Sequence, residues 1–226
     1  MQRRLTLAAG VLVAGCLAVQ ASYEQKADEA ALPVVLPKPM FTGTPKTLKV
    51  PNLEPARDGK KRPDFFAPKG TVNLAAKKPV TGSDKEPVIG ELDYVTDGDK
   101  EGGDGSYVEL GPGKQYVQID LEQSVNIYAL LVWHFHGQAC VYHDVVVQVS
   151  ADADFITGVT TVYNNDHDNS SGFGIGKDLA YIETNEGRLI DAKGVKGRYV
   201  RLYSKGNTSS DMNHYTEVEV FGVPAK

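Results

Sequence analysis

Short apolar runs separated by turn-forming clusters dominate the second half of the chain. In one run, Val117, Ile119 and Leu121 alternate with polar neighbours, which places their side chains on one face of a β-strand. No run after residue 70 has the 3.6-residue period of an amphipathic helix. The runs cover residues 115–121, 126–136, 143–150, 198–204 and 214–221. They predict an all-β fold, a jelly-roll β-sandwich with one core between two sheets.

The first sixteen residues follow a different pattern. Two arginines precede an apolar stretch at 5–13, which is too short to cross a bilayer because a spanning helix needs about 20 residues. Val13-Ala14-Gly15-Cys16 resembles the lipobox of bacterial lipoproteins, whose cysteine is lipidated and becomes the new N-terminus. The resemblance implies export and a lipid anchor at Cys16, on the periplasmic or cell-surface side of a bacterial membrane. The alternative is an ordinary secretory signal with an incidental cysteine.

Prolines interrupt the chain between residues 17 and 69. Because proline fixes φ and lacks a backbone donor, neither a helix nor a ladder can propagate through this segment. We expect an extended tether, with Phe65-Phe66 apolar enough to pack back onto the domain. The predicted organisation is a signal and lipobox at 1–16, a Pro-rich tether at 17–69 and a β-sandwich domain at 70–223.

Composition narrows the classes of function. With 41% hydrophobic and 23% charged residues, the 226-residue chain has the composition of a soluble globular protein. A net charge of -5 gives no basic footprint, so we expect no nucleic-acid partner. The two cysteines are Cys16 and Cys140, so the domain has no internal disulfide and depends on its core.

Six motifs in one order resemble the discoidin (coagulation-factor type C) domain family, which includes the galactose-binding-like carbohydrate-binding modules. The motifs are Asn73-Leu74-Ala75, Thr96-Asp97-Gly98-Asp99, Tyr116 to Leu121, Val147 to Ser150, Arg198 to Tyr203 and Glu217 to Gly222. The resemblance implies a jelly roll whose loops at one end bind glycans, lipids or proteins, without catalysis. Two features depart from the family: Tyr116 replaces the usual tryptophan, and residues 164–187 form a longer connection.

Asp97-Gly98-Asp99 is the strongest candidate metal site. Two carboxylates flank a glycine that can turn the chain around a hard cation, and calcium takes about 6–8 oxygen ligands. The family resemblance implies a structural calcium held by the carboxylates of Asp97 and Glu217 and the carbonyls of Tyr94, Asp99 and Thr216. The alternative is a solvated acidic turn.

All five histidines lie in the predicted domain: His134, His136, His143, His167 and His214. His134 and His136 share one face of a predicted strand, and the following loop can bring His143 back to them. Such a trio of imidazoles suits Zn²⁺ or Cu²⁺, with Cys140 as a soft ligand. Hydrogen bonding to carbonyls, or contact with a sugar, is the alternative.

The polar stretch 164–172 is the candidate ligand loop. Amide and carboxylate groups bind vicinal hydroxyls through paired hydrogen bonds, and nearby aromatic rings can stack on a sugar. A surface loop rich in turn formers is the alternative. The predicted ligand-binding residues are His134, His136, Asn165, Asp166, His167 and Phe173.

The sequence contains no G-x-S-x-G, H-E-x-x-H, Walker loop or helix-opening G-x-G-x-x-G motif. We therefore expect no enzyme, but a membrane-tethered binding module for carbohydrate or a cell-envelope glycan. Two alternatives stay open: a histidine-based transition-metal protein or enzyme, and a cell-envelope module that adheres to another protein.

Overall fold

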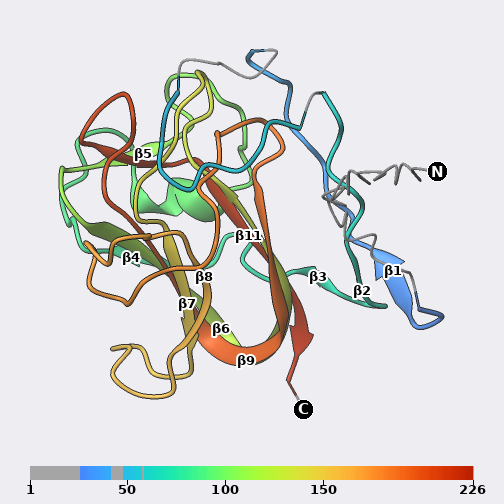
Figure 1. Cartoon of the computed structure of the whole chain (residues 1–226). Coiled ribbons are helices and arrows are strands. Elements are labelled where there is room, and N and C mark those ends of the chain that lie inside the picture. The colour runs from blue at the N-terminus through green and yellow to red at the C-terminus, as the bar shows by residue number, and fades with distance from the viewer. Residues whose placement is uncertain (1–25, 42–47, 58, 226) are drawn as a thin grey trace, which may run out of the picture.

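The computed structural model describes residues 26–41, 48–57 and 59–225. The predicted lipobox and Cys16 lie outside these residues. Eleven strands and one 3-10 helix form in the described part of the chain, and it contains no α-helix (Figure 1). They are β1 (Glu29–Ala31), β2 (Phe66–Pro68), β3 (Val72–Asn73), β4 (Val80–Gly82), η1 (Leu92–Thr96), β5 (Val108–Leu110), β6 (Gln115–Trp133), β7 (Val146–Ser150), β8 (Thr160–Asn164), β9 (Arg188–Ser204), β10 (Asn213–Tyr215) and β11 (Glu217–Pro224). The predicted all-β jelly-roll sandwich is confirmed.

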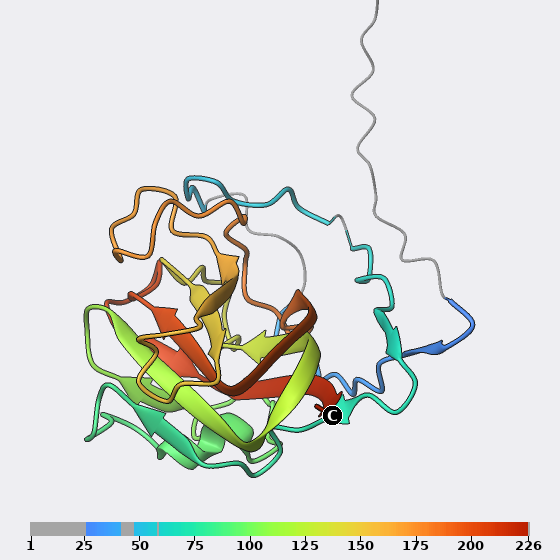
Figure 2. The same cartoon turned by 90° about the horizontal axis from the view of Figure 1, so that it is seen from below.

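The main sheet has the order β3-β11-β6-β9-β7-β8, and β4 also pairs with β6. All of these pairs are antiparallel. The two long strands β6 and β9 curve together around the core (Figures 1 and 2). Their pairing register shifts between Asp120 and Val125, where Glu122 has a φ of 63°. This irregularity lets one pair of strands contribute to both layers of the sandwich.

The main core lies between the layers and matches the predicted alternation. Val117 and Ile119 are fully buried, and so are Val200 and Leu202 opposite them on β9. On β11 the inward side chain of Val218 is also fully buried. Each large apolar side chain removed from water stabilises the fold by roughly 1.5–3 kcal/mol.

The second half of β6 is buried on both faces. Leu130 and Val132 face the main core, whereas Leu131 and Trp133 face a second apolar cluster on the outer side of the sheet. The other buried members of that cluster are Phe65, Ala67, Ala129 and Phe221, with Leu32, Val34, Tyr128 and Leu189 packed against them. Burial on both faces explains why this strand is continuously apolar rather than alternating.

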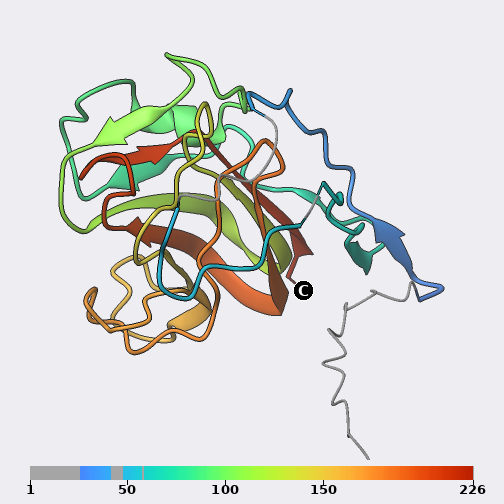
Figure 3. The same cartoon turned by 45° about the horizontal axis from the view of Figure 1, so that its top comes forward.

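The N-terminal segment (described residues 26–69) supplies the cover for this outer face. Its strands β1 and β2 pair with each other, and Leu32 N–H donates to the Phe65 carbonyl at 3.0 Å. Phe65 is only 8% exposed, so the expectation that Phe65-Phe66 packs back onto the domain holds for Phe65. The segment then follows the surface of the domain, as two views show (Figures 1 and 3). The described part of the predicted tether is therefore packed against the domain.

Two further features concern the predicted anchor and the lone domain cysteine. In the described residues, no helix combines the length and apolar character needed to cross a membrane. Cys140 is a free, buried thiol, and burial raises its pKa far above the usual value.

We predict that Phe65→Ala destabilises the protein by about 3 kcal/mol, because it leaves a cavity against the outer cluster. Phe66→Ala is the matched control, since Phe66 is only partly buried and its truncation should cost much less. Urea unfolding of both variants measures the difference. Equal losses for the two would contradict the packing described here.

Candidate functional site

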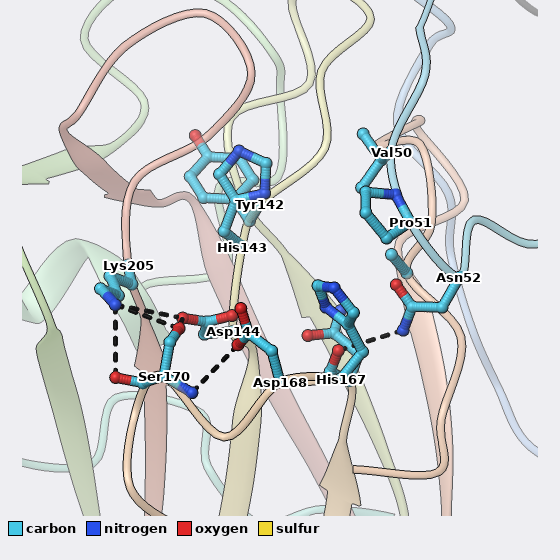
Figure 4. Close-up of a pocket in the computed structure, with 12 residues that line it drawn as sticks. Val50, Pro51, Asn52, Tyr142, His143, Asp144, His167, Asp168, Ser170 and Lys205 are labelled. Carbon is cyan, nitrogen blue, oxygen red and sulfur yellow. Dashed lines mark hydrogen bonds and ion pairs between the residues drawn. The ribbon is translucent and has the colours of Figure 1, made fainter. Parts of the chain in front are cut away.

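A pocket of about 300 Å³ lies at one end of the β7-β8-β9 part of the sheet. Because these strands are antiparallel neighbours, the start of β7 and the ends of β8 and β9 meet at the same edge. The residues lining the pocket come from the loops at that edge and from the N-terminal segment (Figure 4). They are Val50, Pro51, Asn52, Tyr142, His143, Asp144, Asn165, His167, Asp168, Ser170, Ala180 and Lys205.

One side of the pocket carries a connected set of polar groups. Lys205 Nζ donates to the hydroxyl of Ser170 at 3.1 Å, and that hydroxyl donates to Asp144 Oδ2 at 2.6 Å. Lys205 and Asp144 also form an ion pair at 3.6 Å. Backbone hydrogen bonds between His143 and residues 205 and 206 hold the two loops together. The pocket therefore presents hydrogen-bond donors and acceptors on loops that are bonded to each other.

Asn165 and Asp166, both predicted as ligand residues, hold the loop in shape. Asn165 Oδ1 accepts the Val145 N–H at 2.7 Å. Asp166 is fully buried and accepts backbone N–H groups of Ser170 and Ser171. Burial alone would raise the pKa of Asp166, but the hydrogen bonds from these serines outweigh it and lower the pKa. Of the predicted loop residues, Asn165 and His167 line the pocket, and His167 is exposed.

Three other predicted ligand residues lie away from the pocket. Phe173 packs on Tyr203, with ring centroids 4.4 Å apart. His134 is fully buried; its Nδ1 lies 2.6 Å from Glu183 Oε1. His136 is fully buried too, and its Nε2–H donates to the Lys100 carbonyl at 2.9 Å. The prediction that His134 and His136 contact a ligand is therefore corrected, because both side chains are internal.

The alternative of a transition-metal trio, His134, His136 and His143, is also corrected. β6 ends at Trp133, so His134 and His136 follow the strand instead of lying on it, while His143 lines the pocket. In the described residues, only Asp144, Asp166 and Asp168 form a trio of His, Cys, Asp or Glu whose ligand atoms lie within 4.8 Å of one another. His134, His136 and His143 do not converge.

Two of the predicted calcium residues, Asp97 and Glu217, lie close together where β11 begins. Gly98 N–H donates to Glu217 Oε2 at 3.1 Å, so the Asp-Gly-Asp turn touches the first residue of the last strand. The other carboxylate oxygen of Glu217 is buried without a hydrogen-bond partner. Burial, with smaller contributions from Glu219 and Asp97, raises the pKa of Glu217 to about 8. A buried carboxylate with a free oxygen beside a second acid is an arrangement that a cation would neutralise.

The rest of this turn is ordered around its own carboxylates. Asp97 Oδ1 accepts the Asp99 N–H at 2.7 Å, and Asp99 Oδ2 accepts the Ser106 hydroxyl at 2.9 Å. Tyr94 lies in η1 and its carbonyl faces the Asp97 N–H at 3.5 Å. Thr216 donates its N–H to the Trp133 carbonyl at 2.9 Å. The donor set is all oxygen, which suits a hard cation such as calcium.

Several pocket residues were not predicted from the sequence. Val50, Pro51 and Asn52 come from the predicted tether, and Asp144 and Lys205 from short loops at strand ends. No motif or periodicity marks them. Asp144 and Lys205 could have been found from their positions next to strands, because residues that flank neighbouring strands at one sheet edge are expected to lie together.

The fold and the pocket define a jelly-roll β-sandwich with a polar pocket at a loop edge. No family model matches the sequence, and no curated protein matches it. Solved structures do show similarity. A mutant of chitosan-binding module 1 from a chitosanase/glucanase of Paenibacillus sp. IK-5 is 22% identical, with a TM-score of 0.49 over 66% of this chain and 98% of that one.

Two further similar solved structures are also named as binding modules. The CBM32 of AlyQ in complex with 4,5-unsaturated mannuronic acid is 19% identical over 63% of this chain and 93% of that one, with a TM-score of 0.47. A fucose binding module of Streptococcus pneumoniae, SpX-3, is 19% identical over 66% of this chain and 96% of that one, also with a TM-score of 0.47. Chitosan, mannuronic acid and fucose are the ligands of those three modules.

Proposed function

We propose that the chain is a non-catalytic carbohydrate-binding module whose glycan enters the pocket beside β7, β8 and β9. One observation carries the proposal: loops from three strands place hydroxyl, imidazole, ammonium and carboxylate groups around a single pocket. Sugars offer adjacent hydroxyls that both donate and accept, so they match a site containing both kinds of group. The order of family-like motifs in the sequence supports the same class of ligand.

Charge around the pocket favours neutral and amino sugars over uronic acids. Asp144 and Asp168 line it, and Asp166 lies next to both, whereas Lys205 is the only Lys or Arg among the lining residues. Carboxylates attract an ammonium group and repel a uronate, with an energy that salt screens where the groups are exposed. The test panel therefore contains neutral oligosaccharides of galactose, glucose, mannose and fucose, chitosan oligosaccharides and alginate oligosaccharides.

We predict that the double variant His167→Ala, Asp168→Ala weakens glycan binding at least tenfold, since each lost hydrogen bond contributes about 1 kcal/mol. Both side chains are exposed, and Asp168 also accepts the Ser170 N–H at 3.0 Å, so the variant loses one bond within the loop while the sheets should be unaffected. Asp154→Ala is the matched control, because it removes one exposed acid from a different loop. Calorimetry against the panel measures the affinities. If no panel member binds the wild type, the glycan proposal is wrong and adhesion to a protein replaces it.

We also propose a structural calcium ion at the start of β11. The carboxylates of Asp97 and Glu217 would hold it, together with the carbonyls of Tyr94, Asp99 and Thr216. The partnerless buried oxygen of Glu217 supports this assignment. When bound, the ion would supply positive charge to a buried acid and connect the η1 turn to the last strand.

We predict that calcium raises the melting temperature by several degrees, since a ligand at about a hundred times its Kd stabilises by roughly 2.7 kcal/mol. Metal-free protein should show a pH dependence. Glu217 has its pKa raised from 4.5 to about 8 in the folded state, so its contribution to stability is fully present below pH 4.5 and is lost as pH rises through about 8. Calcium should suppress that loss by compensating the ionised carboxylate.

Glu217→Gln should abolish both the calcium response and this pH dependence. Asp93→Asn, at an exposed acid of η1, is the control that should retain both. Thermal melts from pH 4 to 9, with chelator or with calcium, make the comparison. A wild-type melting temperature that is the same in both conditions would count against the ion.

The proposed location is the periplasmic or cell-surface side of a bacterial membrane, reached through a lipid on Cys16. The four residues Val13-Ala14-Gly15-Cys16 carry this proposal. Each buried acyl CH₂ contributes about 0.8 kcal/mol, so two or more chains would anchor the protein stably. Many anchored copies would also engage a polymeric glycan together and offset weak single-site binding.

We predict that Cys16→Ser moves the protein from the membrane fraction to the soluble fraction. Cell fractionation and detergent partitioning measure the shift, and Cys140→Ser, at the buried domain cysteine, should leave the distribution unchanged. A wild type that is already soluble would refute the anchor.

A further inference from the structure

Part of the pocket wall belongs to the N-terminal segment. Val50, Pro51 and Asn52 line one side, opposite Lys205, Asp144 and Ser170 (Figure 4). Val50 and Pro51 give that side an apolar surface. Among the lining residues from the domain, only Tyr142 and Ala180 are hydrophobic, and both are buried. Sugar sites generally need such a surface, because one face of the ring carries C–H groups.

Backbone pairing attaches this wall to the β8–β9 connection. In the strap (residues 48–57), the Asn52 carbonyl accepts the Ala180 N–H at 3.1 Å. Glu54 N–H then donates to the Ala180 carbonyl at 2.8 Å, and Leu53 forms a parallel bridge with Ala180. The strap is thus held by an isolated β-bridge and its flanking backbone bonds against the connection that carries His167.

The Asn52 side chain connects the strap to both ends of that loop. Its Nδ2 donates to the Asn165 carbonyl at 3.1 Å and to the Asp178 carbonyl at 3.2 Å. Asn52 also has a φ of 53°, a left-handed backbone that Asn adopts more readily than most residues. The backbone conformation of Asn52 and its side-chain amide therefore both support the contact between the strap and this loop.

Ion pairs secure the strap just beyond the pocket. Glu54 pairs with Arg188 at 2.7 Å, and Arg57 pairs with Glu186 at 2.6 Å. Arg62 donates to the Glu186 and Gly187 carbonyls at 2.7 and 3.0 Å. These partly buried contacts make the strap a fixed part of the domain surface.

We propose that the strap completes the sugar site, with Val50 and Pro51 as its apolar wall and Asn52 as a positioning residue, and that the pocket takes the terminal sugar of a glycan chain. This inference rests on the proposed carbohydrate function. The pocket volume of about 300 Å³ is at the lower end of the range of about 300–1,000 Å³ for small-molecule sites. The wall on the strap side encloses the pocket on that side, which favours a chain end over a chain interior.

Asn52→Gly tests the positioning role. Glycine accepts the left-handed backbone, so the variant removes only the amide that holds the two carbonyls. We expect the Kd for the best-binding oligosaccharide of the panel to rise about tenfold. Asn185→Ala is the matched control: it removes an equivalent bond between the N-terminal segment and the same connection, from Asn185 Nδ2 to the Pro37 carbonyl at 2.9 Å, and Pro37 does not line the pocket. Its affinity should stay at the wild-type value.

Two outcomes separate this inference from the proposed function. If the wild type binds a panel oligosaccharide and Asn52→Gly binds it equally well, the strap has no part in the site, although the function stands. If the wild type binds none of them, the function itself fails. Val50→Asp, which places a charge on the apolar wall, should also weaken binding of neutral sugars, and an unchanged Kd would contradict the role of the wall.

Two measurements on the wild-type full-length chain avoid any folding defect of a variant. Amide hydrogen exchange of residues 48–57 should slow when the same oligosaccharide saturates the protein, and unchanged exchange there would overturn the proposal. Dimers and hexamers of that sugar should bind with equal affinity per chain end. An affinity that grows with the number of internal units would instead show binding along the chain.

Discussion

The second half of β6 is apolar on both faces, and the rest of the molecule depends on covering both. Leu130 and Val132 point into the sandwich, which buries them between its layers. Leu131 and Trp133 point the other way, and exposing them would cost several kcal/mol. A sandwich alone leaves that outer face in water, so the fold requires an additional layer. The N-terminal segment, with Phe65 at its end, supplies that layer.

This requirement brings the N-terminal segment next to the proposed binding site. A chain that must run from β1 to β2 across the domain surface passes the β8–β9 connection on its way, and it forms backbone bonds there at Leu53 and Glu54. The same residues that satisfy their backbone groups against Ala180 also place Val50 and Pro51 at the pocket. Packing on one side of the protein therefore determines the shape of a site on another.

The sequence predicted the strands well and the contacts of their polar residues poorly. Alternation identified Val117 and Ile119 as core residues, because a period of two has one structural meaning in a half-buried strand. His134 was predicted to contact a ligand, yet it is buried against Glu183, a partner 49 positions further along the chain that no local pattern indicates. Residues of the Pro-rich segment, such as Val50, show no hydrophobic periodicity. Their place in the pocket therefore follows only from the folded structure.

The bonds between Asn52 and the β8–β9 connection span 113 and 126 positions in sequence. Contacts at such separation form late, because closing a long loop costs entropy that only the assembled sheet can offset. The strap leaves the ribosome early, but its docking partners at residues 165 and 178 are synthesised long afterwards. We therefore expect the sheets to assemble first and the pocket to be the last part of the molecule to take shape. A chain ending before β9 would have no finished edge for the strap to join.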